Sequence, residues 1–288
     1  NRCIVFVIYY HLKIFYDFSF NIAGNISTFK NKVLSLGGGT NIPGKTHLGN
    51  QVNTMIEPGK PIGYFYGYKM DGVFQTQEEI NNYRGGPDNT IIMPTAEPGD
   101  LKFVDLNGDG KLGEEDRTMI GNPHPDFTFG LTLSGEYKGF DLSMFFQGSV
   151  GNDILNILKY DIYSGTGWYN APKDIFDKFW TGPGSTNENF AISANSRDNL
   201  TMSEWYIENG SYVRLKNVTL GYTFPKQWVQ KLTVQNLRLF VAAQNLFTIT
   251  SYSGLDPELG NSNPAFMGID MGWYPQARSF MVGLSLKL

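Results

Sequence analysis

The 288-residue sequence has little of what most functional classes require. Its one cysteine, Cys3, excludes a disulfide framework, and its three histidines, His11, His47 and His124, are scattered along the chain. The sequence contains no zinc-ligand spacing and no Ser/His/Asp arrangement, so we expect no enzyme. Charged residues make up 17% of the chain, the formal net charge is −4, and there is no basic run. This balance argues against nucleic acid as a partner.

Long hydrophobic runs are also missing. No stretch reaches the ~18 consecutive apolar residues that a transmembrane helix needs. Residues 4–10, IVFVIYY, form a short apolar run, and residues 1–15 stay unassigned as an irregular or strand-like start. The chain begins at Asn1 rather than methionine and shows no convincing secretory leader. We therefore expect a fragment of a longer protein.

Aromatic residues (15%) and glycines (33) are abundant, which is typical of β-structure with frequent turns. Six segments of roughly 10 residues alternate strictly between apolar and polar side chains, as strands do. This length suits a tilted strand that crosses a bilayer, with Leu131, Met144, Leu239 and Leu284 facing lipid. The six segments are residues 17–27, 127–137, 141–147, 218–224, 237–244 and 279–288.

The connections between these segments alternate in length. A tight turn at Lys138-Gly139 and residues 225–235 are short, whereas residues 29–126, 150–211 and 248–275 are long. Short periplasmic turns and long extracellular loops are typical of outer-membrane barrels. The sequence thus predicts an all-β fold, part of a large antiparallel transmembrane β-barrel. Because a soluble sandwich also alternates, a secreted, calcium-braced carbohydrate-binding β-domain stays open as the alternative.

Several segments resemble one family in the same order along the chain. They are GKPIGYFYGYKMDGVFQTQEEI (59–80), PGDLKFVDLNGDGKLGEEDRTMIGNPHPDFTFG (98–130), YVRLKNVTLGYTFP (212–225), LRLFVAAQNLFTIT (237–250) and GLDPE (254–258). Residues 16–288 resemble the C-terminal barrel part of SusC/RagA-type TonB-linked outer-membrane proteins. Residues 1–15 match no pattern of this family, and the chain ends on Leu288 where the family commonly has an aromatic residue.

The resemblance implies a 22-stranded barrel in the bacterial outer membrane, surrounded by its lipid, and a SusD-like surface lipoprotein as partner. It implies import of glycans or oligopeptides, driven by TonB. The plug and the TonB-contacting segment belong to the family's N-terminal part, which this sequence does not contain. We therefore expect this chain to transport only as part of the larger assembly.

A calcium-like loop, DLNGDGKLGEED, lies at residues 105–116 within the long connection 29–126. The spacing predicts side-chain ligands from Asp105, Asn107 and Asp109, a backbone carbonyl from Lys111 and a closing carboxylate from Asp116. The alternative is a glycine-rich Asx turn that binds nothing. If calcium binds, we expect it to brace the loop rather than to act in chemistry.

Aromatic residues in the expected outer loops are candidates for contact with a ligand or partner. Sugars stack on such rings, but aromatic side chains also pack loops together or contact a lipoprotein. Residues 171–180 predict a short helix with Ile175, Phe176 and Phe179 on its inner face. Arg238 is expected to point inward and pair with a plug carboxylate. The contact candidates are Trp168, Tyr169, Trp205, Tyr206, Trp273 and Tyr274.

Overall fold

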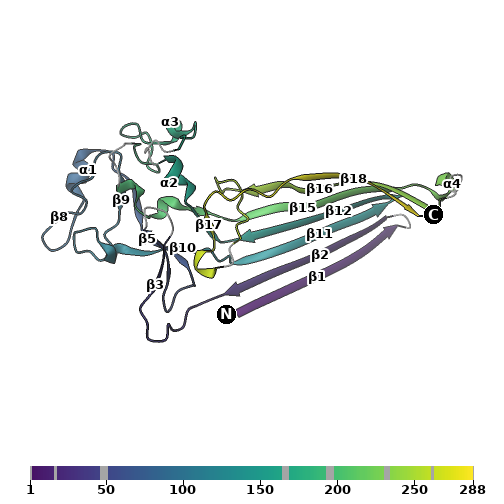
Figure 1. Cartoon of the computed structure of the whole chain (residues 1–288), viewed down its shortest axis with the longest axis horizontal. Helices are drawn as coiled ribbons and strands as arrows, with labels where there is room; N and C mark the ends of the chain where they lie inside the picture. Colours follow the sequence, from purple (N-terminus) through teal and green to yellow (C-terminus); the bar gives the residue numbers. More distant parts are fainter. Residues whose placement is uncertain are drawn as a thin grey trace.

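A computed structural model of the chain describes residues 2–15, 18–45, 51–163, 169–192, 198–229, 234–260 and 263–287. It consists of one long sheet and a body of folded loops at one end of that sheet (Figure 1). Seven strands form the sheet in the order β1-β2-β11-β12-β15-β16-β18, all with antiparallel neighbours. They are β1 (Arg2–Phe15), β2 (Phe18–Lys30), β11 (Phe127–Tyr137), β12 (Phe140–Val150), β15 (Tyr212–Thr223), β16 (Asn236–Thr250) and β18 (Ser279–Lys287).

The described residues of all six predicted segments lie in strands of this sheet, and β1 adds a seventh strand from the segment that the sequence left unassigned. Ile4–Tyr10 of β1 are exposed on both faces of an edge strand, so no polar alternation marks them. An 11-residue strand is ~37 Å long, and a tilt near 40° reduces its height to roughly 29 Å, close to the apolar band of such barrels. The strands thus have the height of a membrane wall.

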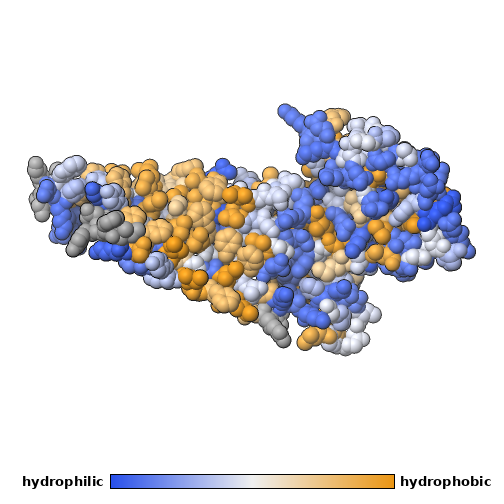
Figure 2. Space-filling model, turned by 180° about the vertical axis from the view of Figure 1, so that it is seen from behind, coloured by the Kyte–Doolittle hydropathy of each residue, from blue (hydrophilic) through white to orange (hydrophobic). Residues whose placement is uncertain are grey.

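The two faces of the sheet differ as the alternation predicts. Directly paired residues point to the same side of an antiparallel sheet. Leu133 pairs with Met144, and Leu239 pairs with Leu284, so these side chains share one face. Figure 2 shows this face as an apolar band between the polar turn end and the polar loops. No second sheet covers the band among the described residues, which contradicts a compact sandwich and leaves the apolar face exposed, as a lipid-facing wall requires. Exposed members of the band include Leu142, Leu220, Leu239, Val241, Val282, Leu284 and Leu286.

Short connections lie at one end of the sheet and long ones at the other (Figure 1). The β11–β12 turn places Lys138 at φ 47° and Gly139 at φ 87°. Two positive φ angles match the type I′ hairpin that the right-handed strand twist favours. A short segment with helix α4 (Lys226–Val229) joins β15 to β16 at the same end. The expected asymmetry between the two ends is confirmed.

The three long connections fold together as one body. In it, β5 pairs with β10 and β4, β13 pairs with β14 and, in parallel, with β17, and β6 pairs with β9. Aromatic side chains dominate its core, with Phe65, Phe74, Phe190 and Tyr206 fully buried. The elements of the body are β3 (Ile42–Lys45), β4 (Val52–Ile56), β5 (Tyr64–Tyr68), β6 (Met70–Val73), α1 (Gln77–Asn82), β7 (Arg84–Gly85), β8 (Thr90–Ile91), β9 (Leu101–Phe103), η1 (Glu114–Asp116), β10 (Arg117–Gly121), β13 (Asp153–Asn156), α2 (Leu158–Tyr163), α3 (Ile175–Lys178), η2 (Asp198–Leu200), η3 (Glu204–Tyr206), β14 (Ile207–Asn209), η5 (Pro264–Phe266) and β17 (Ile269–Asp270).

Backbone hydrogen bonds join the three connections directly. Tyr68 N–H donates to Met202 O at 3.0 Å, which ties the first connection to the second. Leu155 N–H donates to Gly268 O at 2.9 Å, which ties the second to the third. The loops are therefore packed against one another and have a defined shape. Within the described part of the chain, no helix has the length and apolar character to cross a membrane.

Candidate functional site

The calcium-like loop is closed by its own carboxylates. The Asp116 side chain is fully buried, and its two oxygens accept from the N–H groups of Leu106, Asn107 and Gly113 at 2.9, 3.2 and 2.7 Å. Asp105 accepts from Gly108 and Gly110 at 2.7 and 2.8 Å. A carboxylate that accepts several backbone N–H groups fixes a turn without any metal.

The remaining predicted ligands follow the same pattern. Asn107 Oδ1 accepts from Asp109 N–H at 2.8 Å, and Asp109 Oδ1 accepts from Lys111 N–H at 2.9 Å. Among the described residues, no three His, Cys, Asp or Glu side chains converge as a metal site. The oxygen donors are of the kind that calcium prefers, but their observed bonds already account for the shape of the loop. Calcium binding by this loop stays a prediction.

The aromatic candidates divide into a buried pair and an exposed set. Trp205 and Tyr206 are 6% and 0% exposed. The Trp205 ring packs with Phe179, Phe190 and Tyr206. Tyr206 is enclosed in this core, whereas Trp205 also lines the cavity of about 450 Å³ described below. Contact of these two residues with a ligand or partner stays a prediction. Tyr169, Trp273 and Tyr274 remain exposed, and Trp168 lies outside the described residues.

The short helix of the second connection also differs from its prediction in one residue. Helix α3 covers Ile175–Lys178, within the predicted range. Ile175 and Phe179 are buried as expected, whereas Phe176 is 84% exposed. The helix has little more than one turn, so its inner face has room for only two apolar residues.

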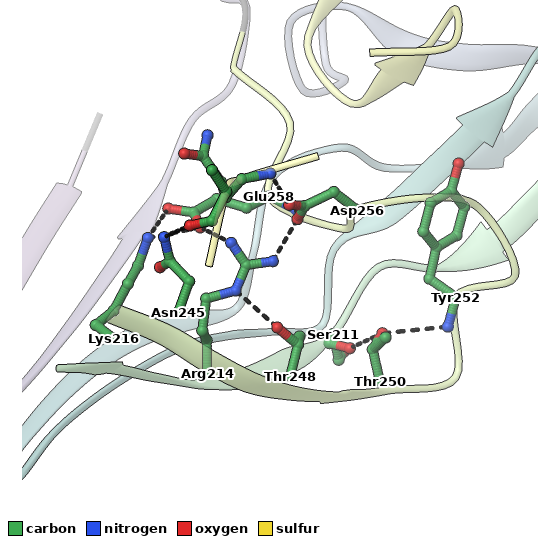
Figure 3. A network of polar contacts seen from close by, with 11 residues as sticks. Ser211, Arg214, Lys216, Asn245, Thr248, Thr250, Tyr252, Asp256 and Glu258 are labelled. Carbon is green, nitrogen blue, oxygen red and sulfur yellow. Dashed lines mark hydrogen bonds and ion pairs between the residues drawn. The ribbon is translucent and has the colours of Figure 1, made fainter. Parts of the chain in front are cut away.

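A buried ion-pair network, which the sequence analysis missed, fixes the third connection to the sheet (Figure 3). Arg214 of β15 is 4% exposed in its side chain and contacts Asp256 at 2.5 Å and Glu258 at 2.6 Å. Its Nε donates to Thr248 Oγ1 of β16 at 2.7 Å. Lys216 adds a second contact to Glu258 at 2.7 Å. Two strands of the sheet thus hold the Leu255–Glu258 segment.

Asp256 also organises the chain that follows it. Its Oδ2 accepts from Gln276 N–H at 2.8 Å and its Oδ1 from Glu258 N–H at 2.9 Å. Burial raises the pKa of the Asp256 carboxyl, but the Gln276 N–H, the Arg214 guanidinium and the Glu258 N–H together lower it overall. The carboxylate is therefore ionised, which suits a buried arginine partner. The sequence signal was the acidic pair in GLDPE together with the alternating Arg214 and Lys216 of YVRLKN.

A second polar cluster joins the second and third connections. Lys159 Nζ lies 3.0 Å from Glu208 Oε1 and 4.9 Å from the centre of the Trp205 ring. Glu208 also accepts from Ser253 N–H at 2.8 Å and from Asn156 Nδ2 at 3.0 Å. Burial raises the pKa of Glu208, but Lys159 and the Ser253 hydrogen bonds lower it overall. These groups line a cavity of about 450 Å³ in the loop body.

On the polar face of the sheet, Arg238 has a partner within the chain. Its Nε and Nη2 contact the two oxygens of Asp141 at 2.8 and 2.5 Å, across Gly221 of β15. The expected pairing of Arg238 with a plug carboxylate is therefore revised. The bidentate pair joins β12 to β16 where Gly221 has no side chain to block it.

Comparisons with known proteins identify relatives of this chain. No family model matches the chain. It is 37% identical over 285 residues to the TonB-dependent receptor P3 of Formosa agariphila, an alignment that covers 94% of this chain and 27% of that receptor. The chain is a homologue of the TonB-dependent receptors. It is also 28% identical over 284 residues to the TonB-dependent receptor SusC of Bacteroides thetaiotaomicron, covering 94% of this chain and 24% of SusC.

Solved structures agree on the fold of this receptor homologue. A chain in the structure of the RagAB peptide transporter matches with a TM-score of 0.72 at 20% identity, covering 96% of this chain and 28% of that one. The RagAB peptide importer in its open-open state matches with a TM-score of 0.69, covering 99% and 28%. The chain thus spans about a quarter of the length of the relatives it matches. The sheet and loop body share the fold of one part of an outer-membrane transporter.

Proposed function

We propose that this chain forms part of the wall and the outer loops of a TonB-dependent transporter that imports glycans or oligopeptides. One observation carries the proposal: a single-layered sheet of bilayer height has an apolar outer face, short turns at one end and a folded loop body at the other. Similarity to receptors named TonB-dependent supports energy transfer from TonB, and similarity to SusC and to the RagAB peptide transporter supports nutrient import.

The partners follow from the same reasoning. A SusD-like lipoprotein would contact the exposed side of the loop body, where Tyr169, Trp273 and Tyr274 are available. The cavity beside Lys159 and Glu208 lies in the same body and is a candidate contact for cargo. Its ion pairs and amide groups suit hydroxyl or peptide groups equally, so its chemistry does not choose between glycan and peptide.

Uptake by cells tests this function. A strain that lacks the full-length receptor is compared with its parent for uptake of labelled oligosaccharide and labelled oligopeptide mixtures. We expect the deletion strain to lose uptake of one of the two, oligosaccharides or oligopeptides. The parent strain should lose the same uptake when an uncoupler removes the energy that TonB transmits. Unchanged uptake of both classes, or receptor in the soluble fraction, would contradict the proposal.

A further inference from the structure

The apolar face of the sheet carries a hollow near its turn end. The hollow has a volume of about 290 Å³ and lies over β2, β11, β12 and β15, well inside the sheet and away from both edge strands. Gly135 of β11 is its floor. Phe20 of β2 and Leu142 of β12 flank Gly135 on its two sides, and Tyr137 and Phe140 lie at the turn end of the hollow.

Gly135 contributes no side chain to the apolar face, and the space above it is open. Gly148, on the same face, differs, because a β-carbon there would lie 2.4 Å from the Phe129 ring. A β-carbon on Gly135 would meet only Ser19 O at 3.4 Å and Phe20 Cδ2 at 3.5 Å, which are ordinary contact distances. A larger side chain at Gly135 would therefore extend into the hollow.

The turn end of the hollow adds an aromatic rim and a cation. Tyr137 meets Phe18 edge to face with ring centres 6.3 Å apart, and Phe140 packs on Tyr222 with ring centres 4.6 Å apart. Lys138 Nζ lies 5.3 Å from the centre of the Tyr137 ring. Asp141, a nearby acid on β12, is paired with Arg238 rather than with Lys138.

We propose that this hollow binds one phospholipid, with an acyl chain over Gly135 and the phosphate at Lys138. The inference rests on the membrane placement proposed above. Short turns face the periplasm, so the hollow opens to the inner leaflet, where phospholipid is the lipid available. Aromatic rings at headgroup level and a lysine beside them match the boundary between acyl chain and phosphate.

Retained lipid tests the site in the full-length receptor, purified from outer membranes and washed in detergent. Gly135→Leu fills the hollow, and Gly24→Leu is the matched control on the same face outside it. We expect about one phospholipid per receptor to be lost from the first variant and none from the second, measured as organic phosphorus per protein. Equal retention in wild type and Gly135→Leu would refute the site, as would lipopolysaccharide in place of phospholipid.

A second variant keeps the test decisive if Gly135→Leu fails to assemble. Lys138→Asn removes the charge, and asparagine tolerates the positive φ of this turn position. We expect it to bind anionic phosphatidylglycerol several-fold more weakly in vesicles, and unchanged binding would count against the phosphate contact. Receptor that still fractionates with outer membranes but retains no such lipid would refute only this site, whereas receptor in the soluble fraction would refute the proposed function.

Discussion

Arg214→Met in the full-length receptor removes the cation that holds the third long connection to the sheet. Asp256 would keep its two backbone donors but lose its guanidinium partner, at a position where its side chain is only 6% exposed. Removing one partner of a buried ion pair costs about 3–5 kcal/mol because the other charge stays buried without compensation. We therefore expect the Leu255–Gln276 region to open far more often than in the wild type.

Hydrogen exchange measures this opening directly. The amides of Gln276 and Glu258 donate to Asp256, so they exchange when the network opens. A cost of 3–5 kcal/mol corresponds to exchange faster by roughly 10²- to 10³-fold or more, since 1.4 kcal/mol is tenfold. Peptides that cover residues 255–277 report it by mass spectrometry.

Lys216→Met is the matched control. Lys216 contacts the same Glu258, but the two side chains are 18% and 26% exposed. Partly exposed pairs contribute about 0–1 kcal/mol, so exchange should accelerate by less than about tenfold. Equal effects of the two substitutions, or no acceleration with Arg214→Met, would show that the network does not hold the loop.

Four further predictions follow from other contacts. Met144→Arg, on the apolar face, should cost about 2–4 kcal/mol in denaturant unfolding from lipid vesicles, whereas Ser143→Arg, its neighbour on the opposite face, should cost much less; equal costs would place the apolar face away from lipid. Asp105→Ala and Asp109→Ala should each weaken calcium binding to the receptor, with Asp88→Ala as control; indistinguishable titrations would remove the calcium site. Tyr206→Phe should raise the free energy of unfolding by about 1 kcal/mol, measured as a higher melting temperature, because the buried hydroxyl has no partner among the described residues; a lower melting temperature would reveal a partner. The carboxyls of Glu208 and Asp256 have lowered pKa values, so their stabilisation is complete above the ordinary carboxyl pKa near 4 and lost as pH falls below it; protease cleavage of the loop body should therefore begin only in strong acid, and cleavage already at pH 6 would contradict this.

Most strands of the sheet could be predicted from the sequence because the two faces of the sheet lie in different environments. Leu131, Met144 and Leu284 alternate with polar residues, and that difference is visible as period two. Strand β1 has no such difference, since Ile4–Tyr10 are apolar on both faces, and it stayed unassigned for that reason. Alternation of apolar and polar residues indicates that the two faces of a strand lie in different environments. A strand that is apolar on both faces therefore cannot be recognised by it.

The ion-pair network could not be placed from the sequence because its partners are far apart along the chain. Arg214 and Asp256 are 42 residues apart, and the approach depends on how the third connection folds back over β15 and β16. Arg238 shows the same limit: the sequence indicated its polar face, but its partner Asp141 lies two strands away across Gly221. The type of a residue and the face on which it lies are local properties. Which side chains form ion pairs depends on the register of the strands and on glycines that leave space between the partners.

The dipeptide Trp-Tyr occurs three times in the outer connections, and its burial differs from one position to another. Residues that contact a ligand or partner therefore cannot be identified from the dipeptide alone. Trp205-Tyr206 belongs to the buried aromatic core of the loop body, whereas Trp273-Tyr274 follows β17 and Tyr274 is 91% exposed. Asp270 fixes the turn that carries Trp273 and Tyr274. Its buried carboxylate accepts from Gly272 and Trp273 N–H at 2.8 and 3.2 Å and from Tyr252 O–H at 2.6 Å. These hydrogen bonds fix the backbone of the turn, so binding there would cost little backbone entropy. Of the aromatic candidates, Trp273 and Tyr274 are thus the pair that a partner or cargo would contact with least reorganisation.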